Sequence, residues 1–174
     1  DCSYQRRHQK VVEEAPAPQL TAATREKICQ TAVAIAKHVG YENAGTVEFL
    51  LDKNNEDFFF LEMNSRLQVE HSVTEAVWGV DLVQAQIRIA LGETIDEIFT
   101  TPPSPRGHAI EARVYAEDPA QQYAPSPGKI ELLEWPTAVG LRIDTGVREK
   151  NTISLNYDPM IAKITAHAAN RDAC

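Results

Sequence analysis

Residues 44–71, AGTVEFLLDKNNEDFFFLEMNSRLQVEH, join two β-rich runs to a regularly alternating polar tail. The runs AGTVEFLLD and DFFFLEMN are rich in aromatic and aliphatic residues, and the polar residues 53–56 between them are typical of a hairpin loop. From Glu62 to Glu70, polar side chains occupy every second position, which is the period of a strand with one polar face. The stretch therefore predicts a β-hairpin whose second strand continues as an extended polar segment to residue 71.

The register of this hairpin decides whether two acids meet. With Lys53 opposite Glu56, the side chains of Glu48 and Glu62 would lie on opposite faces as solvated surface acids. An odd loop or a bulge, with Lys53 opposite Asp57, would place Glu48 directly across from Glu62. Two adjacent carboxylates repel each other unless positive charge lies between them. Both registers remain open from the sequence alone.

The order of side chains along the polar face predicts three chemical roles, if the acids meet. Two carboxylates and the amide of Asn64 would leave coordination positions of Mg²⁺ or Mn²⁺ open for water and nucleotide phosphates. Arg66 and Gln68 offer donors for a small carboxylate-like or carbonate anion, and Glu70 could act as a base toward that anion. The simpler alternative is a polar strand face that serves only solubility.

The flanking sequence predicts an α+β chain. Helical spacing of apolar residues indicates a helix over 21–39, with Thr21 as N-cap and Gly40 as the stop, and a second helix from Asp81 to Gly92. The proline-rich stretch 100–107 separates this part from a predominantly antiparallel β region. The strand-like runs of that region are 108–117, 128–136, 140–147, 152–160 and 160–171. Within the first run, Arg113 shares a strand face with Glu111, which predicts a surface ion pair.

Composition narrows the class of protein. The chain has 174 residues, 43% of them hydrophobic, and a formal net charge of −8, which argues against an extended nucleic-acid surface. Its three cysteines lie far apart, which suggests neither a disulfide framework nor a metal site and fits a reducing compartment. No apolar run approaches the roughly 20 residues that span a bilayer. We expect a globular protein of the cytoplasm or the mitochondrial matrix, with no nucleic-acid and no membrane partner.

Seven segments follow one another along the chain: QRRHQKVVEEAPAP, GTVEFL, LEMNSRLQVEHSVTE, GVDLV, RGHAIEARVYAEDP, PSPGKI and YDPMIAKI. In this order they resemble the biotin carboxylases, which are the ATP-grasp components of biotin-dependent carboxylases. The resemblance covers nearly the whole chain and is nearest to the α subunits of acyl-CoA carboxylases. It implies that residues 1–99 are the C-terminal part of an ATP-grasp domain and that residues 106–174 begin the biotin carboxylase C-terminal domain. The remainder of both domains is expected to lie outside this chain, so the piece alone is expected to have little or no turnover.

The resemblance also implies a role for each matching position. It assigns metal binding to Glu48, Glu62 and Asn64, nucleotide contacts to Gln5, His8 and Leu50, bicarbonate binding to Lys10, Arg66, Gln68 and Val69, proton abstraction from bicarbonate to Glu70, and biotin binding to Arg113. Of these, Glu70, Arg66, Arg113 and Lys10 are the expected catalytic residues.

The implied reaction is ATP-dependent carboxylation of biotin with bicarbonate through carboxyphosphate. The implied cofactors are ATP and Mg²⁺ or Mn²⁺, with biotin as a substrate on a carrier domain. The implied partners are that biotin carboxyl carrier domain, a carboxyltransferase and further copies of the same chain. Three alternatives remain open: the equivalent part of a pyruvate or urea carboxylase, a non-catalytic truncated ATP-grasp module, and the related synthetase domain for carbamoyl phosphate. Arg113 argues against the last, because it has a role only if biotin is the acceptor.

Overall fold

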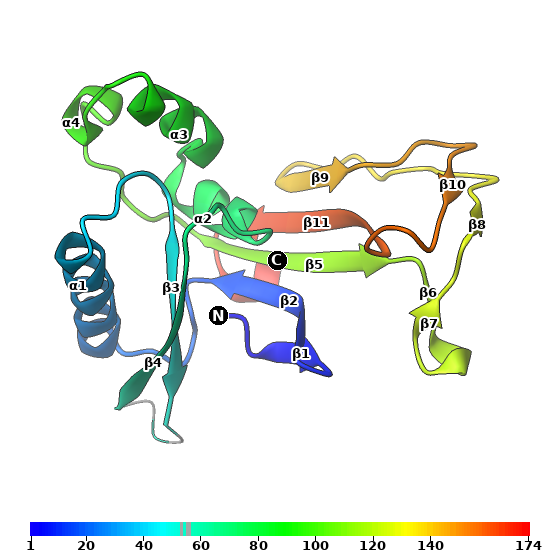
Figure 1. Cartoon of the computed structure of the whole chain (residues 1–174), viewed down its shortest axis with the longest axis horizontal. Coiled ribbons are helices and arrows are strands. Elements are labelled where there is room, and N and C mark those ends of the chain that lie inside the picture. The colour runs from blue at the N-terminus through cyan, green and yellow to red at the C-terminus, as the bar shows by residue number, and fades with distance from the viewer. Residues whose placement is uncertain (53, 55–56) are drawn as a thin grey trace. The chain divides into compact units, whose positions relative to one another are not determined.

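The computed structural model describes residues 1–52, 54 and 57–174 (Figure 1). The chain forms two compact units, one of residues 1–15 with 107–174 and the other of residues 16–106. The N-terminal residues are therefore grouped with the C-terminal region, although more than ninety residues separate them along the chain. The division into domains 1–99 and 106–174 concerns the domains of the resembled family and stays a prediction.

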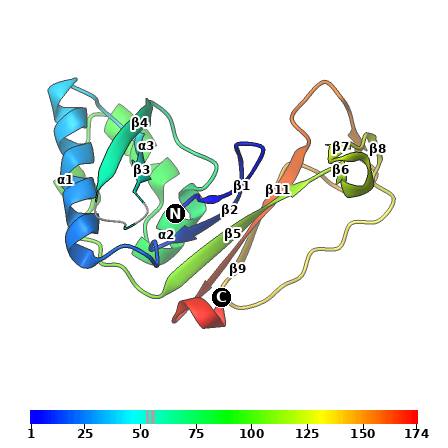
Figure 2. The ribbon, with the colours of Figure 1, turned by 90° about the horizontal axis from the view of Figure 1, so that it is seen from below.

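The first unit is built on a five-stranded antiparallel sheet in the order β1-β2-β5-β11-β9. In both views β11 lies between β5 and β9 (Figures 1 and 2). The strands are β1 (Tyr4–Arg6), β2 (Gln9–Ala15), β5 (His108–Tyr115), β9 (Leu141–Thr145) and β11 (Met160–Ala168). Short pairs β6 (Glu117–Asp118) with β7 (Ala124–Pro125) and β8 (Gly128–Lys129) with β10 (Thr152–Ile153) extend this unit, and single 3₁₀ turns occur at Pro119–Gln121 and Arg171–Ala173.

One face of this sheet buries charged and polar side chains as well as alanine. Glu13 on β2 pairs in register with Glu111 on β5, and Glu111 pairs with Thr165 on β11. The three residues are 1%, 0% and 2% exposed. Because side chains alternate across a strand, the next position on the same face of β5 is Arg113, which pairs with Lys163 of β11. The unit is thus held by a buried polar layer as well as by Ala109 and Ala162.

The second unit combines a β-hairpin with four helices. The hairpin consists of β3 (Thr46–Leu51) and β4 (Phe58–Asn64), and the helices are α1 (Ala22–His38), α2 (His71–Trp78), α3 (Leu82–Ala90) and α4 (Ile95–Ile98). In both views α1 runs beside the hairpin (Figures 1 and 2). The buried apolar residues of this unit are Val73, Val77 and Ala85, which lie on α2 and α3. Among the residues described here, no helix has the length and hydropathy of a membrane-spanning segment.

The α+β class and the principal elements are confirmed. The predicted N-cap of α1 is present, because the Thr21 hydroxyl accepts a hydrogen bond from the Thr24 amide at 3.1 Å. Asp81 caps α3 in the same way, accepting from the Gln84 amide at 2.7 Å. Gly40 follows α1 with a φ of +62°, a left-handed conformation that glycine adopts with little strain because it has no Cβ atom.

Several sequence predictions were wrong in detail. The run 128–136 forms a strand only at Gly128–Lys129, and the run 152–160 forms one mainly at Thr152–Ile153. No element was predicted for the segment that forms β1 and β2, although the two residues between these strands, Arg7 and His8, have the positive φ values of a tight turn. Helices α2 and α4 were also missed, because each has only one or two turns and shows little periodicity.

The extended polar strand predicted to residue 71 ends instead at Asn64. Residues 65–70 form bends and a turn, and α2 begins at His71. The His71 amide donates to the Gln68 carbonyl at 3.3 Å and the Val73 amide to the Glu70 carbonyl at 3.3 Å, which closes the turn into the helix. The alternation of polar residues is therefore divided between a strand and a turn, and it does not describe one continuous strand face.

Candidate active site

The hairpin places Glu48 directly across from Glu62 by means of a bulge. Near the loop the register pairs Leu51 with Phe58 and Phe49 with Phe60, and the register shifts between Glu48 and Phe49. Without that shift, the two acids would lie on opposite faces of the hairpin. The predicted pairing of Lys53 with either Glu56 or Asp57 involves residues outside the described part of the chain.

Amide groups lie between the two carboxylates. The Asn64 Nδ2 group donates to Glu62 Oε1 at 2.9 Å and to Glu48 Oε1 at 3.2 Å. The Gln68 Nε2 group donates to the same Glu48 oxygen at 3.0 Å. Gln68 is buried at 7% exposure, whereas Glu62 is exposed. The hairpin thus collects two acids and two amides, and its amide hydrogens supply the partial positive charge that adjacent carboxylates need.

The donor set of this cluster suits a hard divalent cation. Carboxylate and amide oxygens are the ligands that Mg²⁺ and Mn²⁺ prefer, and two acids with one amide leave room for water and phosphate oxygens. Asn64 contacts both acids. Its side chain therefore lies where it could serve as the third protein ligand of a cation shared by Glu48 and Glu62. Across the described residues, no group of three or more His, Cys, Asp or Glu side chains forms a metal site. A cation here would therefore rely on the amide as well as the carboxylates.

The turn that follows β4 carries the remaining predicted residues of this unit. Arg66 is exposed, and its guanidinium lies 3.4 Å from Asn64 Oδ1 and donates to the Leu67 carbonyl at 3.2 Å. Val69 and Glu70 form the end of the turn, with Glu70 at the N-cap position of α2. Arg66 thus contacts Asn64, and Asn64 and Gln68 both contact Glu48, with Glu70 two residues beyond Gln68 along the turn.

Sequence reasoning missed two residues that support this turn. His71 Nδ1 lies 2.7 Å from the Gln68 carbonyl, so the imidazole donates there and holds the backbone of the turn. Glu75, one helical turn later and only 8% exposed, accepts from the Leu82 amide at 2.7 Å and lies 3.8 Å from His71 Nε2. The spacing of His71 and Glu75 by four residues was the available signal, because such pairs face each other on a helix.

The other unit carries four further predicted residues. Gln5 on β1 pairs in register with Lys10 on β2, and its side chain donates to the Cys2 carbonyl at 3.0 Å. His8 lies in the turn between these strands, with a φ of +64°. Arg113 lies on β5 of the same sheet. Leu50, the third residue predicted to contact nucleotide, belongs to β3 in the second unit and is 57% exposed.

Arg113 forms a buried ion pair with a partner that the sequence did not suggest. Its Nε and Nη2 atoms both lie 2.6 Å from Glu13 Oε1, and the two side chains are 11% and 1% exposed. The predicted surface location of the Arg113 and Glu111 side chains was wrong, because Glu111 is fully buried; its carboxylate contacts Thr165 at 3.3 Å and Lys163 at 3.8 Å. Burial raises the pKa of the neighbouring Tyr115, and a hydrogen bond with Arg113 offsets part of that increase.

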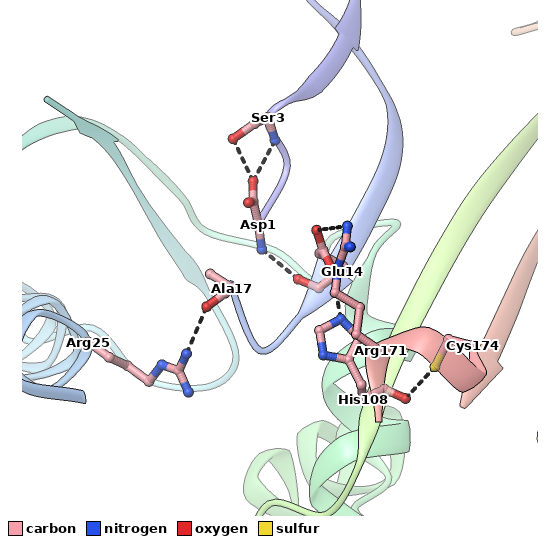
Figure 3. A network of polar contacts seen from close by, with 8 residues as sticks. All are labelled: Asp1, Ser3, Glu14, Ala17, Arg25, His108, Arg171 and Cys174. Atoms are coloured by element: carbon pink, nitrogen blue, oxygen red, sulfur yellow. Dashed lines mark hydrogen bonds and ion pairs between the residues drawn. The ribbon is translucent and has the colours of Figure 1, made fainter. Parts of the chain in front are cut away.

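A second network in this unit centres on Glu14 (Figure 3). Its carboxylate accepts from Arg171 Nε at 2.7 Å and Nη2 at 3.3 Å, and it lies 2.8 Å from His108 Nε2. The hydrogen bonds from Arg171 hold the pKa of Glu14 below its usual value, against the opposing effect of burial and with help from His108. The network ties β2 to β5 and to the 3₁₀ turn at Arg171–Ala173, where Cys174 donates to the His108 carbonyl.

Comparison with known proteins identifies the chain's relatives. Residues 1–98 match the family "Carbamoyl-phosphate synthase L chain, ATP binding domain", and residues 111–174 match "Biotin carboxylase C-terminal domain". The chain is 52% identical over 172 residues to biotin carboxylase 2 of Bacillus subtilis, with 98% of this chain and 38% of the relative covered. It is 51% identical over 174 residues to the mitochondrial methylcrotonoyl-CoA carboxylase subunit alpha of Mus musculus, with 99% and 24% covered.

A solved structure agrees with these sequence matches. The urea carboxylase of Kluyveromyces lactis superimposes with a TM-score of 0.93 at 45% identity, over 99% of this chain and 15% of that protein. The chain thus spans only about a quarter to two fifths of the curated relatives named above, at 24% and 38% of their lengths. The two family matches follow each other along the chain in the order that the sequence motifs predicted, and the chain belongs to the biotin carboxylase family.

Proposed function

We propose that this chain contributes to the ATP-dependent carboxylation of biotin by bicarbonate, the first half-reaction of a biotin-dependent acyl-CoA carboxylase. The observation that carries the proposal is the bulged hairpin, which sets Glu48 across from Glu62 with Asn64 in contact with both. A hairpin that served only packing would gain nothing from opposing two acids on one face, because they repel each other. Membership in the biotin carboxylase family supports a catalytic reason for this repulsion, because the two acids would share a metal ion.

Glu48, Glu62 and Asn64 would hold Mg²⁺ or Mn²⁺, and the ion would neutralise charge on the phosphates of ATP. Nucleotide contacts are proposed for Gln5, His8 and Leu50. Leu50 is 57% exposed, which leaves its side chain available for an apolar contact with a base. These assignments rest on the family motifs together with the donor chemistry of the hairpin.

Arg66, Gln68, Lys10 and the backbone of Val69 would bind bicarbonate. A guanidinium presents planar paired donors to the oxygens of a carbonate-like anion, and the Gln68 amide adds a neutral donor. Glu70 would accept the bicarbonate proton, and the resulting oxyanion would attack the γ-phosphoryl group of ATP, forming carboxyphosphate as the bond to ADP breaks and ADP leaves. The turn that carries Glu70 is held by His71 and by the first amides of α2, so its backbone position is defined without the substrate.

Arg113 would bind the ureido oxygen of biotin. Carboxyphosphate releases CO₂, its phosphate removes the N1 proton of biotin, and the guanidinium stabilises the enolate oxygen until N1 attacks CO₂. A cation fixed within a largely buried sheet face suits this role, because it stabilises developing negative charge with little reorganisation.

The wider setting of the proposal is a multicomponent carboxylase. Biotin would be presented on a carrier domain, and a carboxyltransferase would pass the carboxyl group to its acceptor. The relative from Mus musculus is the α subunit of a methylcrotonoyl-CoA carboxylase, which supports an acyl-CoA acceptor. Assays of the complete carboxylase with methylcrotonyl-CoA, propionyl-CoA, pyruvate and urea would identify the acceptor. We further propose association with additional copies of the chain, which sedimentation of the complete protein would test.

The test of the proposal is Glu70→Gln in the full-length carboxylase. The variant keeps the size of the side chain but cannot take a proton, so biotin carboxylation should fall below detection while MgATP binding stays largely intact. Radiolabelled bicarbonate fixation and equilibrium binding of nucleotide would measure the two. Glu42→Gln, an exposed acid of the same unit, serves as the matched control and should behave as wild type. Undiminished carboxylation by the Glu70 variant would refute the role of Glu70 as base.

A further inference from the structure

We propose that Glu13 is a positioning residue that orients the Arg113 guanidinium for its contact with biotin. The inference rests on the proposed function of Arg113 and extends it to a residue to which the family motifs gave no role. Both residues belong to the same unit, on adjacent strands β2 and β5. Glu13 would act only through Arg113 and would not touch the substrate.

The geometry fixes one edge of the guanidinium. Nε and Nη2 share the edge nearer the side-chain stem, and both lie 2.6 Å from Glu13 Oε1. Because the guanidinium is planar, contacts from two nitrogens on one edge to a single oxygen fix the direction in which that edge faces. The Nη1 end is therefore directed away from Glu13, and its direction is set by the position of one carboxylate.

The strand register explains why Glu13 can act on Arg113. Glu13 is paired with Glu111, so Arg113, two positions beyond Glu111 on the same face of β5, lies diagonally across from Glu13. Glu111 itself contacts Thr165 and Lys163 on the opposite neighbouring strand. Glu13 therefore contacts Arg113 from β2, and Glu111 lies within 3.8 Å of Lys163 on β11.

Burial makes this contact a restraint on orientation. Glu13 is 1% exposed and the Arg113 side chain 11%, so water screens their interaction weakly. A long side chain that was free to sample its rotamers would lose entropy on binding biotin, whereas one held by a buried acid has already lost it. The carboxylate also compensates the guanidinium charge in the absence of substrate, which lowers the cost of keeping that charge in a largely buried position.

The decisive experiment is Glu13→Gln in the full-length carboxylase, assayed with free biotin. The amide retains one acceptor oxygen and the side-chain volume but loses the charge that holds the guanidinium. We expect kcat/KM for biotin to fall about 10- to 100-fold, the loss that follows displacement of a reacting group by about 1 Å. Bicarbonate-dependent ATP hydrolysis without biotin should stay within about twofold of wild type, because Arg113 has no part in that step.

A matched control and a background variant separate positioning from packing. Glu14→Gln changes the adjacent acid of β2, which contacts Arg171 and His108 rather than Arg113, and should leave the biotin step unchanged. In an Arg113→Ala background, Glu13→Gln should cause no further loss, because the residue through which it acts is missing. An equal loss in both backgrounds, or an equal fall of the biotin-independent hydrolysis, would overturn the inference.

Structural measurements give a readout that does not depend on turnover. A crystal structure of the Glu13→Gln protein should show the Arg113 guanidinium moved or in several orientations; an unchanged guanidinium contradicts the inference. If that variant does not fold, Glu13→Asp keeps the charge but shortens the reach, and a wild-type biotin step in it would also overturn the inference. Absence of biotin-dependent turnover in the wild type would refute the proposed function and this inference with it. Active wild type with an equally active Glu13 variant would refute the inference alone.

Discussion

The acids of the β3–β4 hairpin and the acids of the five-stranded sheet differ in the contacts that they make within their own units. Glu48 and Glu62 are contacted by the neutral amides of Asn64 and Gln68. Glu13, Glu14 and Glu111 are contacted by the cationic side chains of Arg113, Arg171 and Lys163. Amides satisfy hydrogen bonds without cancelling charge, whereas guanidinium and ammonium groups do both.

On this difference we base the proposal that the hairpin acids form a binding cluster and the sheet acids a structural one. The carboxylates of Glu48 and Glu62 accept from amides and offer oxygens that can bind a metal ion, and Glu62 is exposed whereas Glu13 and Glu111 are buried. Charge that is cancelled inside a buried layer contributes to stability or to the orientation of its partner. Substitutions in the sheet cluster should therefore lower stability, whereas substitutions in the hairpin cluster should weaken ligand binding.

The largest effect on stability is expected from Lys163→Met in the sheet. Lys163 is 8% exposed and lies 3.8 Å from Glu111 and 3.5 Å from Asp144, so its removal leaves a fully buried carboxylate without this cation. Loss of one partner of a buried pair costs about 3–5 kcal/mol, which denaturant unfolding would measure as a fall in the free energy of unfolding. The control is Lys129→Met, which removes an exposed ion pair with Glu131 and should change the free energy of unfolding by less than about 1 kcal/mol. Similar losses in both variants would remove the distinction between buried and exposed pairs.

A smaller effect, in binding rather than stability, is expected from Glu48→Gln in the hairpin. Replacement of a direct ligand should weaken Mn²⁺ binding at least as much as loss of a supporting residue does, by about 10- to 100-fold. Titration with Mn²⁺ followed by electron paramagnetic resonance would measure this affinity. The free energy of unfolding should change little or increase, because the substitution relieves repulsion with Glu62. A strong loss of stability with normal Mn²⁺ affinity would assign Glu48 to the structural class.

The smallest effect is expected from Glu14→Gln and depends on pH. The folded-state pKa of Glu14 is lowered below the usual value of 4.5, chiefly by its hydrogen bonds from Arg171, so its ionisation stabilises the folded state above that pH. Because Arg171 is 54% exposed, we expect the contribution to be about 1 kcal/mol at neutral pH. The difference between wild type and variant should shrink as the pH falls through the folded pKa, as thermal unfolding at several pH values would show. A difference that grows in acid would contradict this linkage.

The sequence predicted elements well where a local signal was strong. Thr21 and Asp81 were identified as N-caps because a short polar side chain before an apolar helix has one favoured use, and both capping bonds are present. The hairpin was predicted because two β-rich runs are joined by a short polar segment. Prediction failed for residues 62–71, where polar residues alternate along the sequence. Such alternation does not distinguish one long strand from a short strand followed by a turn.

The sequence also predicted only part of the candidate active site. Metal, anion and base roles were assigned to Glu62, Arg66 and Glu70 from residue type and motif, and these assignments stay predictions. The supporting contacts of His71 and Glu75 and the pairing of Arg113 with Glu13 could not be derived from sequence, because they depend on how separate strands and turns pack. A hundred residues separate Glu13 from Arg113.

The sequence by itself determined the α+β class, the caps, the family and the chemical types of the candidate residues, since these depend on local propensity and on ordered motifs. Only the tertiary structure decided which acids meet. One bulge between Glu48 and Phe49 turns two separated acids into a facing pair, and the register of β2 against β5 gives Arg113 its partner. A shift of one residue moves a side chain to the other face of a strand, and no local sequence preference specifies such a shift.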